Sequence, residues 1–191
     1  MSFLQYLING ISIGSVYAII ALGYTMVYGI ARMLNFAHGD VIMVGAYMSY
    51  CVTSYLGLPP AVGVLAAVIV CTLLGVLIEG LAYKPLRGVP SLAVLITAIG
   101  VSYFLQNAAQ LIFGSAPKNF KSIVAMKPLV LFNGGLTVTG EVIVTIAACI
   151  VIMIGLTVFT NRTKMGKSMR AVSEDRDAAQ LMGINVNSTI S

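Results

Sequence analysis

The first residues that could perform chemistry form a nucleophile motif near the N-terminus. Gly10-Ile11-Ser12-Ile13-Gly14 matches the G-x-S-x-G pattern, and His38 with Asp40 would complete a triad. The pattern requires a strand-to-helix turn, whereas this stretch lies in an uncharged segment typical of a membrane helix. About 20 helical residues separate Ser12 from His38 by roughly 30 Å, while a nucleophile and its base lie about 3 Å apart. A membrane-embedded hydrolase, which Ser12→Ala would test, is therefore not the favoured interpretation.

A second pattern is similar to the end of a phosphate-binding loop. Gly166-Lys167-Ser168 supplies the last residues of G-x-x-x-x-G-K-[ST], but Asn161 stands where the first glycine is needed and no strand precedes it. The chain is therefore not expected to bind ATP by this route. If ATP drives the protein, we expect another subunit to hold it, and we predict no cofactor in this chain.

Metal and proton chemistry are also not favoured. Cys51, Cys71 and Cys149 are scattered through apolar segments without paired spacing, which predicts neither a disulfide nor a metal site. A single histidine such as His38 is more often structural than a ligand. Glu79 is more often a paired or snorkelling carboxylate than part of a proton relay, which needs a chain of partners.

The third pattern is a charged segment, Ser173 to Gly183, which predicts a short helix over about 174–182. Ser173 can cap its first free N–H groups, and acidic residues follow near the positive end of the helix dipole. Gly183 supplies the left-handed residue that ends many helices. Ala178, Ala179 and Met182 fall on one half of this helix. Such a helix suits a groove on another protein, or it is a solvated loop helix without a partner, and the local sequence leaves both open.

The amino-acid composition indicates whether the chain folds in water or in a membrane. The 191 residues are 59% hydrophobic and only 9% charged, whereas soluble domains carry about 25% charged residues. We therefore expect an all-α integral membrane protein, a polytopic helical bundle. Its net charge of +5 indicates membrane topology and contact with anionic membrane lipid rather than binding of nucleic acid.

Five apolar stretches are long enough to predict membrane spans in a single membrane domain. Their approximate ranges are 4–31, 34–56, 61–83, 91–113 and 136–159. Residues 162–191 are predicted to lie outside the membrane. The second span is short unless it starts near Met33 and runs irregularly through Asn35 to Asp40, beside protein or a water-filled cavity. An ordinary turn followed by a short helix is the alternative.

Two polar regions are the candidates for a translocation pathway. Asn35, His38 and Asp40 lie at the start of the second span, and the fourth span carries Gln106 and Asn107. Polar side chains at this depth favour a face turned toward protein or water. These five residues are therefore predicted to line such a pathway.

The distribution of basic residues indicates how the chain is oriented across the membrane. If the loop 84–90 is inside, eight basic residues are inside and three are outside, which places the N-terminus outside. The inside set is Arg32, Lys84, Arg87, Arg162, Lys164, Lys167, Arg170 and Arg176, and the outside set is Lys118, Lys121 and Lys127. The charged segment near the C-terminus is then cytoplasmic.

Several blocks, in order along nearly the whole chain, resemble the branched-chain amino acid ABC transporter permeases. They include Leu34-Asn35-Phe36-Ala37-His38-Gly39-Asp40, Tyr83-Lys84-Pro85-Leu86-Arg87, Phe104-Leu105-Gln106-Asn107 and Arg170-Ala171-Val172-Ser173-Glu174-Asp175. The match is most similar to the H-type permease of the high-affinity leucine/isoleucine/valine system. It implies a multi-pass subunit of a bacterial inner membrane that works with a second permease, two cytoplasmic ATPases and a periplasmic amino-acid-binding protein. It also implies no covalent chemistry in this chain, because ATP would be bound by the ATPases.

The resemblance also implies a role for the charged helix. Residues 177–183 fit the E-A-A-x-x-x-G coupling pattern of ABC importers, with Asp177 where glutamate is usual. The implied ATPase-coupling residues are Arg170, Glu174, Asp177, Ala178, Ala179 and Gly183. Members of this family continue into further spans, so we expect a C-terminally truncated sequence.

Two other functions stay open. An ABC permease of the same architecture could carry urea, short amides or a sugar, and an ATP-independent channel or carrier is the less favoured alternative. The sequence does not distinguish the preferred branched-chain amino acid or the partner permease.

Overall fold

The structure, a computed structural model, describes residues 2–31, 35–118, 129–131 and 136–190. Arg32, Lys121 and Lys127 of the orientation argument, and the start of the predicted second span at 33–34, lie outside these ranges. The larger helices are α1 (Ser2–Ala31), α2 (His38–Tyr50), α3 (Pro60–Ile78), α4 (Ser91–Phe113), α5 (Gly140–Arg162) and α6 (Lys164–Glu174). The shorter elements are α7 (Arg176–Leu181), α8 (Val186–Ile190), the π-helical turns η1 (Cys51–Tyr55) and η2 (Glu79–Tyr83), the 3₁₀ turn η3 (Lys84–Leu86), β1 (Leu129–Leu131) and β2 (Leu136–Val138).

The chain forms an all-α membrane protein with one small hairpin. Four stretches of the described residues are long and apolar enough to cross a membrane: Phe3–Ile30, Pro60–Leu86, Leu92–Phe113 and Gly140–Arg162. The predicted span 34–56 corresponds to α2 and η1, which together are long enough but, with His38 and Asp40 in the first turn, not apolar enough to meet this criterion. Whether that segment crosses the membrane stays a prediction.

The fifth predicted span begins later than its apolar run. Leu136–Val138 forms β2, which pairs antiparallel with β1 in the register Leu129↔Val138. Thr137 and Val138 are β-branched and suit a strand, and α5 starts only after Thr139, whose backbone is extended. Hydropathy alone could not separate this hairpin from the helix that follows it.

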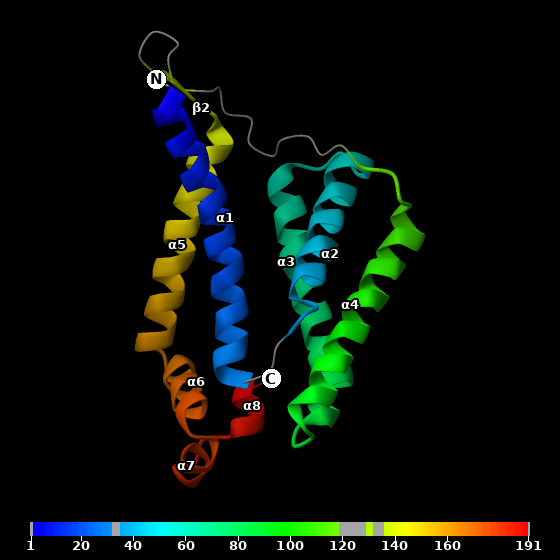
Figure 1. The fold of residues 1–191 in the computed structure, drawn as a ribbon, viewed down its shortest axis with the longest axis vertical. Coiled ribbons are helices and arrows are strands. Elements are labelled where there is room, and N and C mark those ends of the chain that lie inside the picture. Colours follow the sequence, from blue (N-terminus) through cyan, green and yellow to red (C-terminus); the bar gives the residue numbers. More distant parts are fainter. Residues whose placement is uncertain (1, 32–34, 119–128, 132–135, 191) are drawn as a thin grey trace. The chain divides into compact units, whose positions relative to one another are not determined.

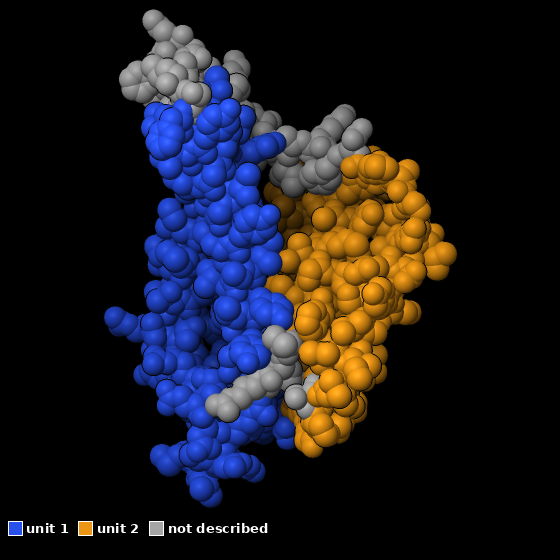
Figure 2. Space-filling view, in the orientation of Figure 1, with its two compact units in different colours: residues 1–30, 121–190 blue, residues 31–120, 191 orange. Residues whose placement is uncertain are grey.

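The chain divides into two compact units, residues 1–30 with 121–190 and residues 31–120 with 191 (Figure 2). In the second unit, α2, α3 and α4 lie side by side (Figure 1). Its small core contains Ala37, Ile78 and Leu105, and the rings of Tyr47 and Phe113 stack with centroids 4.2 Å apart. This unit positions the polar residues of the predicted pathway.

Glycines allow α2 and α3 to approach closely. A Cβ atom on Gly45 would lie 2.7 Å from Cys71 Sγ, and one on Gly63 would lie 3.1 Å from Ser49 Oγ. Cys71 Sγ also donates to the carbonyl of Val41 at 3.3 Å. Dispersion contacts between small residues are what hold apolar helices together in a lipid environment, where no hydrophobic force drives their association.

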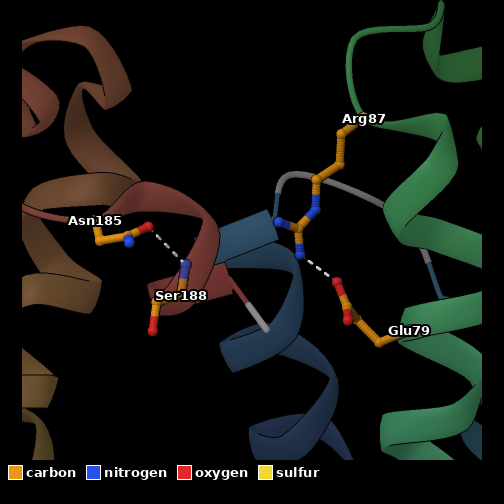
Figure 3. A network of polar contacts seen from close by, with 4 residues as sticks. All are labelled: Glu79, Arg87, Asn185 and Ser188. Atoms are coloured by element: carbon orange, nitrogen blue, oxygen red, sulfur yellow. Dashed lines mark hydrogen bonds and ion pairs between the residues drawn. The ribbon is translucent and has the colours of Figure 1, made fainter.

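In the first unit, α1 contacts the hairpin and α5 continues into α6. The Gln5 side chain donates to the Thr137 carbonyl at 2.8 Å and accepts from its N–H at 3.1 Å. The chain then turns sharply at Thr163 into α6, followed by α7 and α8 (Figure 1). Asn185 caps α8 by accepting from the Ser188 N–H at 3.1 Å (Figure 3).

Candidate functional sites

The first candidate site is a polar network inside the second unit. Asp40, in the first turn of α2, is only 8% exposed, and Gln106 of α4 donates to its Oδ1 at 3.0 Å. The same Gln106 nitrogen also donates to Ser102 Oγ at 3.1 Å. The structure therefore brings together two of the residues predicted for the pathway, although 66 positions separate them in the sequence.

Asn35 joins this unit through a residue that the sequence analysis did not select. The Tyr83 hydroxyl of η2 donates to Asn35 Oδ1 at 2.8 Å, and the Ala37 N–H donates to the same oxygen at 3.1 Å. Asn35 thereby stabilises the turn that precedes α2 and connects it to the end of the apolar stretch Pro60–Leu86. Nothing in the sequence marks Tyr83 for this contact, because it depends on how the turn before α2 lies against η2 in the folded chain.

The other two predicted pathway residues lie outside the Asp40–Gln106–Ser102 contacts. Asn107 is exposed and donates to the Tyr103 carbonyl of its own helix at 2.7 Å. His38 is half-buried in the first turn of α2. One position along α4 changes a residue's direction by about 100°, which explains why Gln106 meets Asp40 and Asn107 does not.

Glu79 forms an ion pair with Arg87 within the second unit (Figure 3). Both side chains are largely buried, with relative exposures of 22% for Glu79 and 16% for Arg87. A carboxylate neutralised by a guanidinium fits the paired role that the sequence favours for Glu79. The pair connects η2 to the residue after η3, so it stabilises the end of the apolar stretch Pro60–Leu86.

The second candidate site is the segment from α6 to α8. Thr163 caps α6 by accepting from the Gly166 N–H at 3.0 Å, and Arg170 donates to Asn161 Oδ1 at 3.0 Å. A Cβ on Gly166 would lie 2.4 Å from the Phe159 carbonyl oxygen. The start of α6 therefore rests directly on the backbone of the last turn of α5.

Asp175, and not Ser173, caps α7. Ser173 lies inside α6, where its hydroxyl donates to the Arg170 carbonyl at 2.7 Å. Asp175 has an extended backbone and accepts from the N–H groups of Asp177 and Ala178 at 2.9 and 3.1 Å. The sequence prediction of a single helix over about 174–182 missed the break at Asp175, which separates α6, ending at Glu174, from α7.

The C-terminal end of α7 follows the predicted pattern. Gly183 has φ +82°, its N–H donates to the Gln180 carbonyl at 3.0 Å, and the Ile184 N–H donates to the Ala179 carbonyl at 3.0 Å. This is the Schellman arrangement, which satisfies the free carbonyls of a helix end. Gly183 is thus the left-handed residue that the sequence indicated.

The surface of α7 differs from the predicted small-residue face. Ala179 is only 4% exposed and packs within the chain, whereas Ala178 is exposed. Leu181 and Met182 are 88% and 83% exposed, and the sequence analysis did not select Leu181. Glu174 and Asp177 are also exposed. The accessible end of α7 is therefore an apolar tip flanked by carboxylates.

No cluster of three or more histidine, cysteine or acidic side chains that could hold a metal occurs among the described residues. Cys51, Cys71 and Cys149 are half-buried free thiols. The two candidate sites consist of amide, hydroxyl and carboxylate groups and of an exposed apolar tip. Such groups suit binding and contact with partners.

The fold and these sites define a polytopic helical membrane protein with a buried polar network and a helical segment that follows its last long apolar helix. The chain belongs to the family described as the branched-chain amino acid transport system permease component, which matches residues 6–191. No solved structure matches the chain significantly.

Curated relatives cover almost all of the chain. It is 40% identical over 201 residues to the high-affinity branched-chain amino acid transport system permease protein BraD of Pseudomonas aeruginosa, covering 98% of this chain and 64% of the relative. It is 41% identical over 202 residues to the protein LivH of Salmonella typhimurium, with the same coverage. A probable branched-chain amino acid transport permease of Methanocaldococcus jannaschii is 30% identical over 180 residues, covering 90% of this chain and 55% of the relative. The chain thus spans less than two thirds of the length of these relatives.

Proposed function

We propose that the chain belongs to the transmembrane permease subunit of an ATP-driven importer that moves branched-chain amino acids into the cytoplasm. The observation that carries this proposal is the identity of about 40% over 98% of the chain to permeases whose names state this transport. The four apolar membrane-length helices and the buried polar network support a role in the membrane.

The proposal includes partners. A second permease would complete the pathway, two cytoplasmic ATPases would bind and hydrolyse ATP, and a periplasmic binding protein would deliver the amino acid. The subunit would lie in the bacterial inner membrane with its N-terminus outside and α6–α8 in the cytoplasm. The excess of basic residues on the side assigned to the cytoplasm supports this orientation.

In this mechanism, α7 transmits motion. The exposed tip with Ala178, Leu181 and Met182 would sit in a groove of an ATPase, and Asp177 with Glu174 would lie at its rim. When the ATPases close on ATP, α7 would move with them and change the packing of the membrane helices. The side chains of this subunit bind and move the amino acid without forming a covalent bond to it.

Uptake of labelled leucine tests the cargo. The permease, expressed from its complete reading frame in cells lacking their own permease, should import leucine. Excess unlabelled isoleucine or valine should block this uptake, urea and ribose should not, and ATP depletion should abolish it. Competition by urea or ribose alone would favour the other small-solute permeases, and uptake that persists without ATP would favour a channel or carrier.

A charge at the tip of α7 tests the coupling role. Ala178→Arg should abolish uptake while the protein stays in the membrane, because a buried unpaired cation in a helix-binding groove is strongly unfavourable. Ser188→Arg places the same charge on an exposed position of α8 and should leave uptake near the wild-type rate. Normal uptake in Ala178→Arg would remove the coupling assignment.

A further inference from the structure

A polar stripe runs along one side of α4. Ser102, Gln106 and Gln110 recur every four residues, which places them on one face of the helix. Gln106 donates to Ser102 at 3.1 Å, and Gln110 donates to Ser115 Oγ at 2.9 Å. Gln106 and Gln110 are exposed in the second unit, although α4 has the length and apolarity of a membrane helix. In a membrane such a stripe faces protein or water rather than lipid.

A buried carboxylate lies directly behind this stripe. Asp40 is 8% exposed, and the donor that reaches it is the amide of Gln106, which is neutral. No ion pair among the described residues involves Asp40, whereas Glu79 is paired with Arg87. A buried charge is costly unless a hydrogen-bonding partner of opposite charge compensates it. The site is therefore built to receive a cationic group that can donate hydrogen bonds.

We infer that Asp40 is the subsite for the ammonium group of the transported amino acid, and that Gln106 holds this carboxylate until the ammonium replaces it. The inference rests on the proposed function. An ammonium group brings three donors and a positive charge to the position that the neutral amide occupies. The released Gln106 amide and the Ser102 hydroxyl beside it are then donors for the carboxylate of the amino acid. Asp40 thus recognises the ammonium group, which distinguishes an amino acid from an apolar acid of the same shape.

Direct binding without the periplasmic binding protein tests this inference. The purified complex of both permeases and the ATPases should bind labelled leucine, and two probes compete with it. The compound 3-methylbutylamine keeps the ammonium and should compete, whereas 4-methyl-2-oxopentanoate lacks it and should not. Asp40→Asn should weaken leucine binding by at least about tenfold, because a charge-assisted hydrogen bond becomes a neutral one.

Two variants are matched to Asp40→Asn. Asp40→Glu keeps the charge and should retain part of the binding. Glu141→Gln removes an exposed carboxylate at the start of α5 and should bind leucine like the wild type. If Asp40→Asn does not assemble, Asp40→Glu decides, because moving the carboxylate of an ammonium subsite should weaken competition by the amine, whereas competition equal to that of the wild type would contradict the assignment to Asp40.

Three results would overturn the inference while leaving the proposed function intact: equal competition by the oxo acid and leucine, unchanged binding in an assembled Asp40→Asn complex, or a wild-type complex that imports leucine with its binding protein but does not bind it alone. A wild-type transporter that imports no branched-chain amino acid would instead contradict the proposed function itself. The uptake assay and the binding assay therefore separate the two failures.

Discussion

At the scale of single residues, the two carboxylates among the described residues of the second unit have different partners. Glu79 is neutralised by Arg87, while the amide of Gln106 reaches Asp40. Removing one partner of a buried ion pair leaves an uncompensated charge, so Glu79 is explained by stability alone. Asp40 is bonded to a neutral amide and to no cation among the described residues, and the inference of a separate role for it rests on this difference in partners.

The Tyr83 hydroxyl provides a prediction at the same scale. Tyr83→Phe should lower the free energy of unfolding by about 1 kcal/mol, because it removes one hydrogen bond to Asn35 and leaves the ring in place. The measurement is thermal denaturation of the purified transporter, followed by the fraction that remains monodisperse. Tyr103→Phe is the control, since Tyr103 is 63% exposed.

Asn35 makes the comparison sharper. Asn35→Ala should cost more than Tyr83→Phe, because it also leaves the Ala37 N–H without its acceptor. The double variant should be less destabilised than the sum of the two single variants, since both remove the same Tyr83–Asn35 contact. Strict additivity would show that this hydrogen bond contributes nothing to the stability of the turn before α2.

At the scale of elements, the corner between α5 and α6 depends on backbone contact. Thr163 Oγ1 donates to the Phe159 carbonyl at 2.7 Å and accepts from the Gly166 N–H at 3.0 Å. Gly166 is buried against the backbone of Phe159 and Thr160, where no side chain fits. At Gly166 the two helices are therefore in direct backbone contact, with no side chain between them.

Gly166→Ala should disrupt this corner. Its Cβ would lie 2.4 Å from both the Phe159 oxygen and Thr160 Cα, and backbone atoms cannot move aside as a flexible side chain can. Overpacking of this kind costs about 1–3 kcal/mol or more, so the variant should unfold at a lower temperature and import less leucine. Gly155→Ala in α5 is the control, because nothing lies within 4 Å of its added Cβ. Equal stability of both variants would contradict the close contact.

At the scale of the whole molecule, the proposed orientation can be measured by chemical labelling. In a background where Cys51, Cys71 and Cys149 are replaced, Ser188→Cys in α8 should react with a membrane-impermeant maleimide only after the cells are opened. Lys118→Cys, after α4, should react in intact cells. Both positions are exposed, so access depends on the side of the membrane. The reverse labelling pattern would invert the orientation.

The sequence predicted the long helices but not the contacts between them. Apolar runs such as Ser91–Phe113 are visible because spanning a bilayer demands about 20 apolar residues. The contact between Asp40 and Gln106 depends on how α2 packs against α4, and no local pattern encodes it. The cap of α7 was predicted at the wrong residue because Ser173 and Asp175 are both good capping residues. Only the end of α6 decides between them.

The close contact of Gly166 with the backbone of α5 affects how motion can pass between the two helices. Where side chains separate two helices, they can change rotamer when one helix moves, but at Gly166 the backbone of α6 directly contacts the backbone of Phe159 and Thr160. Only the capping residue Asp175 separates α6 from α7. The three helices α5, α6 and α7 are therefore closely connected and are expected to move together. If the tip of α7 moves, α5 is then expected to tilt with it, and Gly166 is the point about which the two helices pivot.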